Sequence, residues 1–279
     1  MKLTIVSGRS GSGKSVCLHA LEDLGFYCID NLPVGLLPTL VAHINAHPQI
    51  AVSIDARNLP ADLDRFAGII DELKKTILQH EIIFLDAADH ILIKRFSETR
   101  RKHPLSSEKI SLKEAVQNEA QLLGPINELA DLRIDTSFLN VQQLRELVRN
   151  RISPKTHAGL SLLFQSFGYK YGVPLDADFV FDVRCLPNPY WELNLRNCSG
   201  VAPEVKEYLQ QQTFTKELLT DIQKFLQTWL PRFANDNRNY MTVAIGCTGG
   251  QHRSVYIAEE LANYFRNYYE NIQIRHREL

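Results

Sequence analysis

The sequence is poor in cysteine, has no long apolar run and carries almost no net charge. Its five cysteines are odd in number and include no Cys-x-x-Cys pair, which argues against a disulfide framework or a zinc cluster and favours a reducing compartment. No apolar run approaches the length of a membrane span, and the first residues show no signal-peptide pattern. We therefore expect a cytoplasmic protein without a membrane partner.

A formal net charge of −1 leaves no global field for nucleic acid, so any RNA site has to be a local basic patch. The 44% hydrophobic and 23% charged content are those of an ordinary globular protein. At 279 residues the chain exceeds the usual size of one domain, which favours two.

The clearest signal is a glycine-rich loop that follows an apolar, strand-like run over residues 3–7. Gly8-Arg-Ser-Gly-Ser-Gly-Lys-Ser15 matches the phosphate-loop pattern G-x-x-x-x-G-K-[ST] at every fixed position. Glycines let backbone N–H groups turn toward an anion, Lys14 can reach the outer phosphates and Ser15 can ligate Mg²⁺. A helix over residues 16–25 would point its positive end at the phosphates. We predict a nucleotide site formed by Gly8, Arg9, Ser10, Gly11, Ser12, Gly13, Lys14 and Ser15.

Polar residues follow three more strand-like runs, where open α/β sheets bind ligands. Asp30 either contacts Mg²⁺ or substrate, or only caps the turn before Pro33. Asp55, Ala56, Arg57 and Asn58 could read the base or a second phosphate, with turn capping as the alternative. Asp86 closes a run over 81–85 that resembles a Walker B strand and could hold Mg²⁺ through water, although any buried parallel strand ending in Asp gives this pattern.

The next segment, up to Pro104, is rich in cations: Lys94, Arg95, Arg100, Arg101, Lys102 and His103. It either closes over phosphates or is a solvated helix face. Behind the capping-box pattern Ser111-Leu-Lys-Glu114, a helix has residues at core spacing that include Glu119, and we expect it only to pack. Strands and helices alternate up to about residue 152, which predicts a parallel sheet with helices on both faces and domains at 1–152 and 153–279.

In the second half, the run over 241–246 leads into Cys247-Thr-Gly-Gly-Gln-His-Arg-Ser254 and a helix over 255–265. Backbone N–H groups and a helix N-terminus again converge on a space of anion size, with Arg253 able to clamp the anion. The spacing Cys-x₅-Arg-Ser also occurs in cysteine-dependent phosphatases, which need a general acid such as Asp176, Asp178 or Asp182. Phosphate binding is the favoured interpretation; catalysis and a plain strand–turn–helix are the alternatives.

Taken together, these motifs resemble the bacterial RNase adapter family of RapZ-like, YvcJ-like nucleotide-binding proteins. The resemblance covers essentially the whole chain and is carried by long motifs: Gly8–Ser15, 26–33, 53–58, 95–101, 179–184, 186–189, 244–250 and 252–258. It implies an N-terminal P-loop NTPase or kinase-like parallel-sheet domain. It also implies a C-terminal α/β domain similar to the sugar-phosphate domain of phosphofructokinase.

The resemblance implies a regulatory binding protein with at most slow ATP or GTP hydrolysis. Such a protein would bind ATP or GTP with Mg²⁺ held by Ser15 and Asp86, with Asp55, Ala56, Arg57 and Asn58 as the second nucleotide-contacting segment. It would bind small regulatory RNAs, sense glucosamine-6-phosphate and present RNA to RNase E as a homo-oligomer, expected to be a tetramer, with no DNA partner. No nuclease metal cluster is visible in the sequence, so the partner would cut the RNA.

Two sets of residues are carried over to the C-terminal domain. The implied phosphosugar contacts are Tyr190, Thr248, Gly249, Gly250 and Arg253, and the implied RNA contacts are Arg266, Arg275, His276 and Arg277. Tyr190 stands where relatives have His, so a cationic contact with the sugar is lost. The tail is also less basic than in the family, which predicts weaker or more oligomer-dependent RNA binding. A P-loop small-molecule kinase or weak NTPase is the alternative function.

Overall fold

The computed structural model describes residues 2–43, 47–58, 62–63, 65–75, 79–152, 160–236 and 238–279. The chain divides into two compact units, Met1–Lys155 and Thr156–Leu279. The boundary predicted between residues 152 and 153 borders residues 153–159, which lie outside the described residues, so its position stays a prediction.

The first unit contains a five-stranded parallel sheet with the order β2-β3-β1-β4-β5. Its strands are β1 (Lys2–Gly8), β2 (Tyr27–Ile29), β3 (Gln49–Ile54), β4 (Gln79–Asp86) and β5 (Leu132–Asp135). The predicted parallel sheet is confirmed. Because all strands run in one direction, the phosphate loop after β1 and the polar residues after the other strands lie along one edge.

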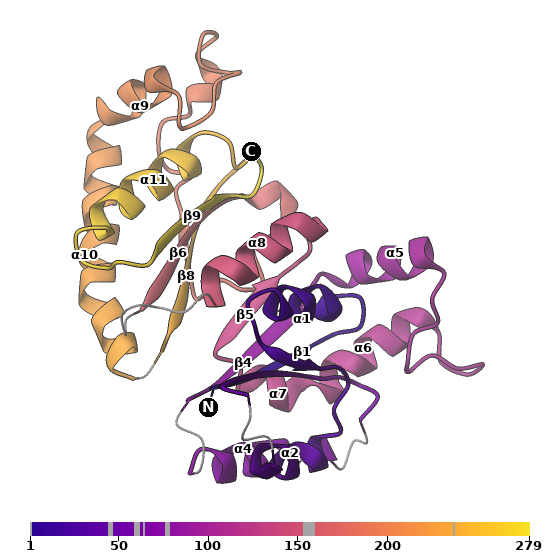
Figure 1. Ribbon diagram of the computed structural model, residues 1–279. Helices are drawn as coiled ribbons and strands as arrows, with labels where there is room; N and C mark the ends of the chain where they lie inside the picture. The colour runs from indigo at the N-terminus through magenta and orange to yellow at the C-terminus, as the bar shows by residue number, and fades with distance from the viewer. Residues whose placement is uncertain are drawn as a thin grey trace. The chain divides into compact units, whose positions relative to one another are not determined.

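Two groups of helices cover the sheet (Figure 1). The helices are α1 (Lys14–Glu22), α2 (Leu37–His43), α4 (Phe66–Leu73), α5 (Asp89–Thr99), α6 (Leu112–Leu122), α7 (Gly124–Glu128) and α8 (Val141–Ile152), with a 3₁₀ turn η1 (Val34–Leu36). α1 packs against α8, and α4 packs against α2 and α7 on the opposite face. Leu3 and Ile5 of β1 form a fully buried core with Phe66 of α4. This burial fixes β1, and with it the start of the phosphate loop.

The second unit contains a four-stranded parallel sheet with the order β7-β8-β6-β9. Its elements are β6 (Ser161–Gly168), η2 (Tyr169–Tyr171), β7 (Phe179–Asp182), η3 (Pro189–Trp191), α9 (Pro203–Gln210), α10 (Thr213–Asn235), β8 (Tyr240–Cys247), α11 (Arg253–Phe265) and β9 (Ile272–His276). β6 and β8 are buried along their whole length, and α11 packs against β6, β8 and β9 (Figure 1). The glycine loop after β8 therefore leaves the centre of the sheet and runs straight into α11.

Among the described residues, no helix combines the length and the apolar character needed to cross a lipid bilayer.

Candidate functional site

The phosphate loop joins β1 to α1, and its backbone needs glycine at defined positions. Gly8, Gly11 and Gly13 have φ angles of 143°, 85° and 107°, a region that L side chains rarely adopt. A Cβ added to Gly8 would lie 2.1 Å from the carbonyl oxygen of Leu85 on β4. At Gly13 it would lie 2.6 Å from Leu144 of α8. The glycine spacing of the motif therefore reflects both dihedral angle and close packing.

Lys14 begins α1 and folds back over the loop. Its Nζ donates to the carbonyl oxygens of Gly8 at 2.7 Å and Arg9 at 3.3 Å. Burial lowers the pKa of the Lys14 ammonium, and the negative charges of Glu119 and Asp55 only partly offset it. Phosphate oxygens would offer this ammonium a better partner than two neutral carbonyls. The adjacent Ser15 is exposed, as a hydroxyl that ligates a nucleotide-bound cation has to be.

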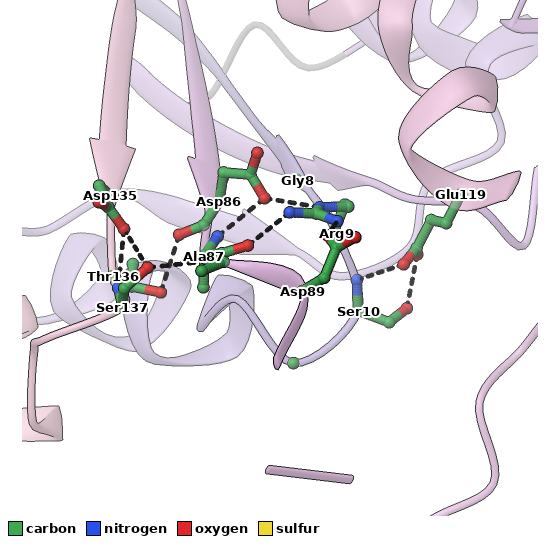
Figure 2. Close-up of polar contacts among 12 residues, drawn as sticks. Gly8, Arg9, Ser10, Asp86, Ala87, Asp89, Glu119, Asp135, Thr136 and Ser137 are labelled. Carbon is green, nitrogen blue, oxygen red and sulfur yellow. Dashed lines mark hydrogen bonds and ion pairs between the residues drawn. The ribbon is translucent and has the colours of Figure 1, made fainter. Parts of the chain in front are cut away.

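Arg9 attaches the loop to the end of β4 and the start of α5 (Figure 2). Its guanidinium is buried and donates from Nε to Asp86 Oδ1 at 2.6 Å, from Nη1 to Asp89 Oδ1 at 2.5 Å and from Nη2 to the carbonyl of Ala87. The Arg9 side chain therefore holds the protein in this conformation rather than extending toward a ligand.

Asp86 is the predicted magnesium residue after β4. Burial raises its pKa, and the neighbouring Arg9 cation partly offsets that effect. Arg9 and the N–H of Ala87 both donate to Oδ1, so Oδ2 takes no part in these two bonds and can accept a bond from a magnesium-bound water. A hydroxyl from Ser15 and a carboxylate oxygen from Asp86 are ligands of the kind Mg²⁺ prefers, so these residues fit the ion that a nucleotide would bring.

The segment after β3 is held mainly by its own hydrogen bonds. Asp55 is buried and accepts from the Arg57 side chain, with an Nη2–Oδ2 distance of 2.6 Å. Although burial alone would raise the pKa of Asp55, the hydrogen bonds from Arg57 and the charge of Lys14 lower it below its usual range. The neighbouring Ala56 is buried, whereas the Arg57 side chain is 49% exposed. Asn58 accepts from the N–H of Val34 at 2.8 Å, as the turn-capping alternative requires.

Asp30 accepts a hydrogen bond from Ser53 Oγ, and the next residue, Asn31, has a φ of 52°. The turn after β2 is thus tied to β3 close to Asp55. The charges of Asp55, Arg57 and Asp30 also act on the pKa of the Lys14 ammonium, which burial lowers. Their contact with a nucleotide stays a prediction.

Three residues hold the phosphate loop in contacts that were not predicted from the sequence. Arg95 of α5 donates to the carbonyl oxygen of Gly11 at 2.9 Å and to Thr136. Glu119 of α6 accepts from the N–H and the hydroxyl of Ser10 (Figure 2), and His103 contacts the same carboxylate. One signal was available, because Glu119 is a charged residue at core spacing on the apolar face of its helix.

In the glycine loop of the second unit, polar groups of Gly250 and Ser254 lie against the Cys247 sulfur. Gly250 N–H lies 3.2 Å from Sγ, and the Ser254 hydroxyl lies 3.1 Å from it. The buried Arg253 donates from Nη1 to the carbonyls of Arg184 and Leu186, at 2.8 and 3.0 Å. Its Nη2 lies 3.4 Å from Thr248 Oγ1, so the guanidinium borders the exposed end of the loop. Gly249 and Gly250 pack against Gly168 at the end of β6.

Tyr190 lies in the turn η3 and is 46% exposed. The Arg196 guanidinium lies over its ring at 4.8 Å, and Arg196 Nε donates to the Tyr190 carbonyl. The backbone N–H of Lys170 donates to the Thr248 carbonyl at 3.3 Å, and its ammonium lies over the Tyr171 ring at 4.6 Å. Aromatic and cationic side chains thus gather beside the glycine loop; the assignment of Tyr190 to sugar binding stays a prediction.

The predicted RNA residues differ in accessibility. Arg266 is exposed just after α11. Arg275 and His276 lie on β9, where His276 contacts Ser166 at 2.9 Å and Glu259 at 3.1 Å. The Arg277 side chain is 2% exposed, pairs with Glu278 at 2.8 Å and donates to the Gly172 carbonyl at 2.5 Å. In this conformation Arg277 stabilises the fold, and its role in RNA binding stays a prediction.

Comparison with known proteins identifies both units. The RapZ-like N-terminal domain model matches residues 1–156, and the RapZ C-terminal domain model matches residues 160–279. A nucleotide-binding protein of Hahella chejuensis is 57% identical over 284 residues, covering 100% of this chain and 99% of that protein. A nucleotide-binding protein of Marinobacter nauticus is 55% identical over 285 residues, covering 100% of this chain and 97% of the relative.

Solved structures give much weaker similarity. Shikimate kinase from Acinetobacter baumannii in complex with shikimate is 14% identical, with a TM-score of 0.39 over 56% of this chain and 95% of that chain. Similarity this low says nothing about what the chain binds. The family is established by the two domain models and the full-length relatives: this chain belongs to the RapZ family of nucleotide-binding proteins.

Proposed function

We propose that this chain is an RNase adapter that binds ATP or GTP with Mg²⁺ in its first unit and glucosamine-6-phosphate in its second. One observation carries the proposal: each unit has a glycine-rich loop between a buried strand and a helix, beside a basic side chain. In the first unit that side chain is Lys14, and in the second it is Arg253. Two such loops suit a protein that combines a nucleotide signal with a sugar-phosphate signal.

The second loop is better suited to binding than to phosphate transfer. One nitrogen of Arg253 donates to two backbone carbonyls, and the other terminal nitrogen lies near Thr248. The candidate acid Asp182 donates no proton readily, because Arg184 pairs with it and lowers its pKa. Asp178 accepts from Arg238 at 2.8 Å and is similarly occupied. Two of the three candidate acids are thus paired with arginines, which favours sensing of a phosphorylated sugar over a cysteine phosphatase reaction.

RNA binding would use local cations, since the chain as a whole is nearly neutral. The exposed Arg266 is better placed for a phosphate contact than Arg277, whose side chain already holds Gly172 and Glu278. We propose small regulatory RNA as the nucleic-acid partner, RNase E as the protein partner that cuts it, and a homotetramer as the working form. Light scattering of the purified chain gives the subunit number directly.

The test is binding of a structured small RNA by the full chain over a salt series, with and without glucosamine-6-phosphate. An adapter of this kind binds RNA with an affinity that falls as salt rises, and the sugar phosphate changes that affinity. Unphosphorylated glucosamine is the matched control. In R253Q, the RNA affinity should no longer change with glucosamine-6-phosphate, while the variant should still bind nucleotide in its first unit.

Two results contradict the proposal. RNA affinity that is independent of both salt and sugar phosphate would remove the adapter function. Stoichiometric transfer of the nucleotide's terminal phosphate to a small acceptor would instead favour a P-loop kinase, the alternative predicted from the sequence.

A further inference from the structure

A buried carboxylate lies directly behind the phosphate loop. Glu119 has 0% exposure and is positioned by α6, where it occupies the apolar face between Val116 and Leu123. Its Oε2 accepts from the Ser10 N–H at 2.9 Å, and its Oε1 accepts from the Ser10 hydroxyl at 2.7 Å (Figure 2). Both donors of one loop residue are thus held by a side chain more than a hundred residues away in the sequence.

The same carboxylate contacts His103, which is 2% exposed. The N–H of Leu105 donates to His103 Nδ1 at 3.1 Å, so Nδ1 acts as an acceptor. The proton lies on Nε2, which donates to Glu119 Oε2 at 3.0 Å. The Phe96 ring packs against the imidazole at 4.9 Å between centroids. His103 is therefore a fixed anchor at the end of the exposed basic residues Arg100, Arg101 and Lys102.

A buried carboxylate is costly unless hydrogen bonds and nearby cations offset its lost hydration. Its bonds to Ser10 and His103 satisfy it locally, and its negative charge partly offsets the burial that lowers the pKa of Lys14. Phosphate arriving at Lys14 adds negative charge to that cation's surroundings. Glu119 is therefore linked to the phosphate loop in two ways, by its hydrogen bonds to Ser10 and by its electrostatic interaction with Lys14.

We propose that Glu119 is a positioning residue that fixes the phosphate loop at Ser10 and couples it, through His103, to the basic segment 100–103. Nucleotide binding then orders the segment that carries Arg100, Arg101 and Lys102. This inference rests on nucleotide binding at the phosphate loop and adds the route by which the bound nucleotide acts on a distant part of the unit.

The first measurement is the Kd of the full chain for Mg·ATP and Mg·GTP in four forms: wild type, E119Q, S10A and the double variant. The amide introduced by E119Q would set an N–H donor against either Ser10 or His103, so we expect the nucleotide Kd to rise about tenfold. S10A removes the donor to Glu119 Oε1 but keeps the bonds of the residue-10 N–H and of His103 to Oε2, and we expect a rise of about threefold. The double variant should be weaker than wild type by less than the product of the two effects, because both substitutions break one network.

The second measurement is amide hydrogen exchange of residues 100–106, a readout that a merely structural role would not move. Nucleotide should slow exchange there in the wild type, and the effect should be lost in S10A, which leaves Glu119 and His103 in place. E128Q, on the exposed end of α7, is the matched carboxylate control and should behave as wild type in both measurements.

The outcomes separate the two proposals. If the wild type binds neither nucleotide, nucleotide binding by this loop is wrong and the coupling falls with it. If the wild type binds but S10A and E119Q keep its Kd within twofold, only the coupling is wrong. Nucleotide-independent exchange of residues 100–106 in the wild type also overturns it. Should E119Q fail to fold, S10A decides the question alone.

Discussion

At the scale of single residues, one charged group of the first unit, Lys14, is held by protein partners that a ligand could replace. Its ammonium rests on two carbonyl oxygens of its own loop. Burial lowers its pKa, so the protein holds the charge at some cost to stability. A bound phosphate would offset that cost by placing negative charge beside the buried ammonium.

Replacing Lys14 with Met should therefore separate binding from stability. We expect the nucleotide Kd to rise about 100-fold, because a charge-assisted bond to phosphate is lost. The melting temperature should equal or exceed that of the wild type, since a desolvated charge is removed. Titration calorimetry and a thermal scan measure the two quantities, and a strongly lowered melting temperature would show that Lys14 instead supports the fold.

Asp55 makes the stability of the first unit depend on pH. Its pKa is lowered in the folded state by Arg57, so its contribution to stability is complete above the unfolded pKa of about 3.9 and is lost as pH falls through the folded pKa. The melting temperature of D55N should lie below that of the wild type at about pH 6, and the difference should shrink progressively as pH falls below about 4. A difference that stays constant from about pH 6 to about pH 3 would contradict this.

Parts of the candidate site were predictable from the sequence where a short local motif defines them. The loop Gly8–Ser15 and the segment 55–58 follow from local patterns. Glu119 did not follow, because its partner Ser10 is more than a hundred positions away and only packing of α6 brings them together. The same reason hides Arg95, whose contact with Gly11 depends on how α5 packs.

At the scale of elements, the pairing of β1 with β4 leaves no room for a side chain at position 8. Gly8 ends β1 with its Cα against the Leu85 carbonyl, and a Cβ would lie 2.1 Å from that oxygen. G8A should lower the free energy of unfolding by about 3 kcal/mol or more, since clash and dihedral strain add.

G25A is the matched control for that substitution. Gly25 has a φ of 86°, and an added Cβ would meet nothing within 4 Å. Only dihedral strain remains there, so the loss should be about 1 kcal/mol. Urea titration of both variants gives the comparison; equal losses would mean that contact with β4 contributes nothing.

Elements were predictable where hydrophobic periodicity was strong. The central strands β1 and β8 are built mainly of apolar and small residues, and both were expected from the runs over 3–7 and 241–246. β9 was not, because Arg275 and His276 suggested a basic tail, whereas the strand alternates around Ile272 and Ile274 beside β6. α5 was hidden in the same way by its cations, although Leu92 and Phe96 are buried one helical turn apart.

At the scale of the whole molecule, each unit has its own buried core, centred on Phe66 in the first and Phe164 in the second. Calorimetry of the full chain should therefore resolve two unfolding transitions. Nucleotide at about 100 times its Kd should raise only one of them, by roughly 5–10 °C. A single transition that shifts as a whole would show that the units unfold together.

The bonds of Arg253 to the carbonyls of Arg184 and Leu186 leave Cys185 between two fixed peptide groups. That thiol is exposed, whereas Cys17 and Cys247 are buried and Cys28 and Cys198 are half-buried. A fluorescent maleimide would consequently attach first at a position tethered to the guanidinium beside the glycine loop. A dye attached at Cys185 could thus serve as an optical reporter, with which compounds can be screened for binding to the second unit in a multiwell plate.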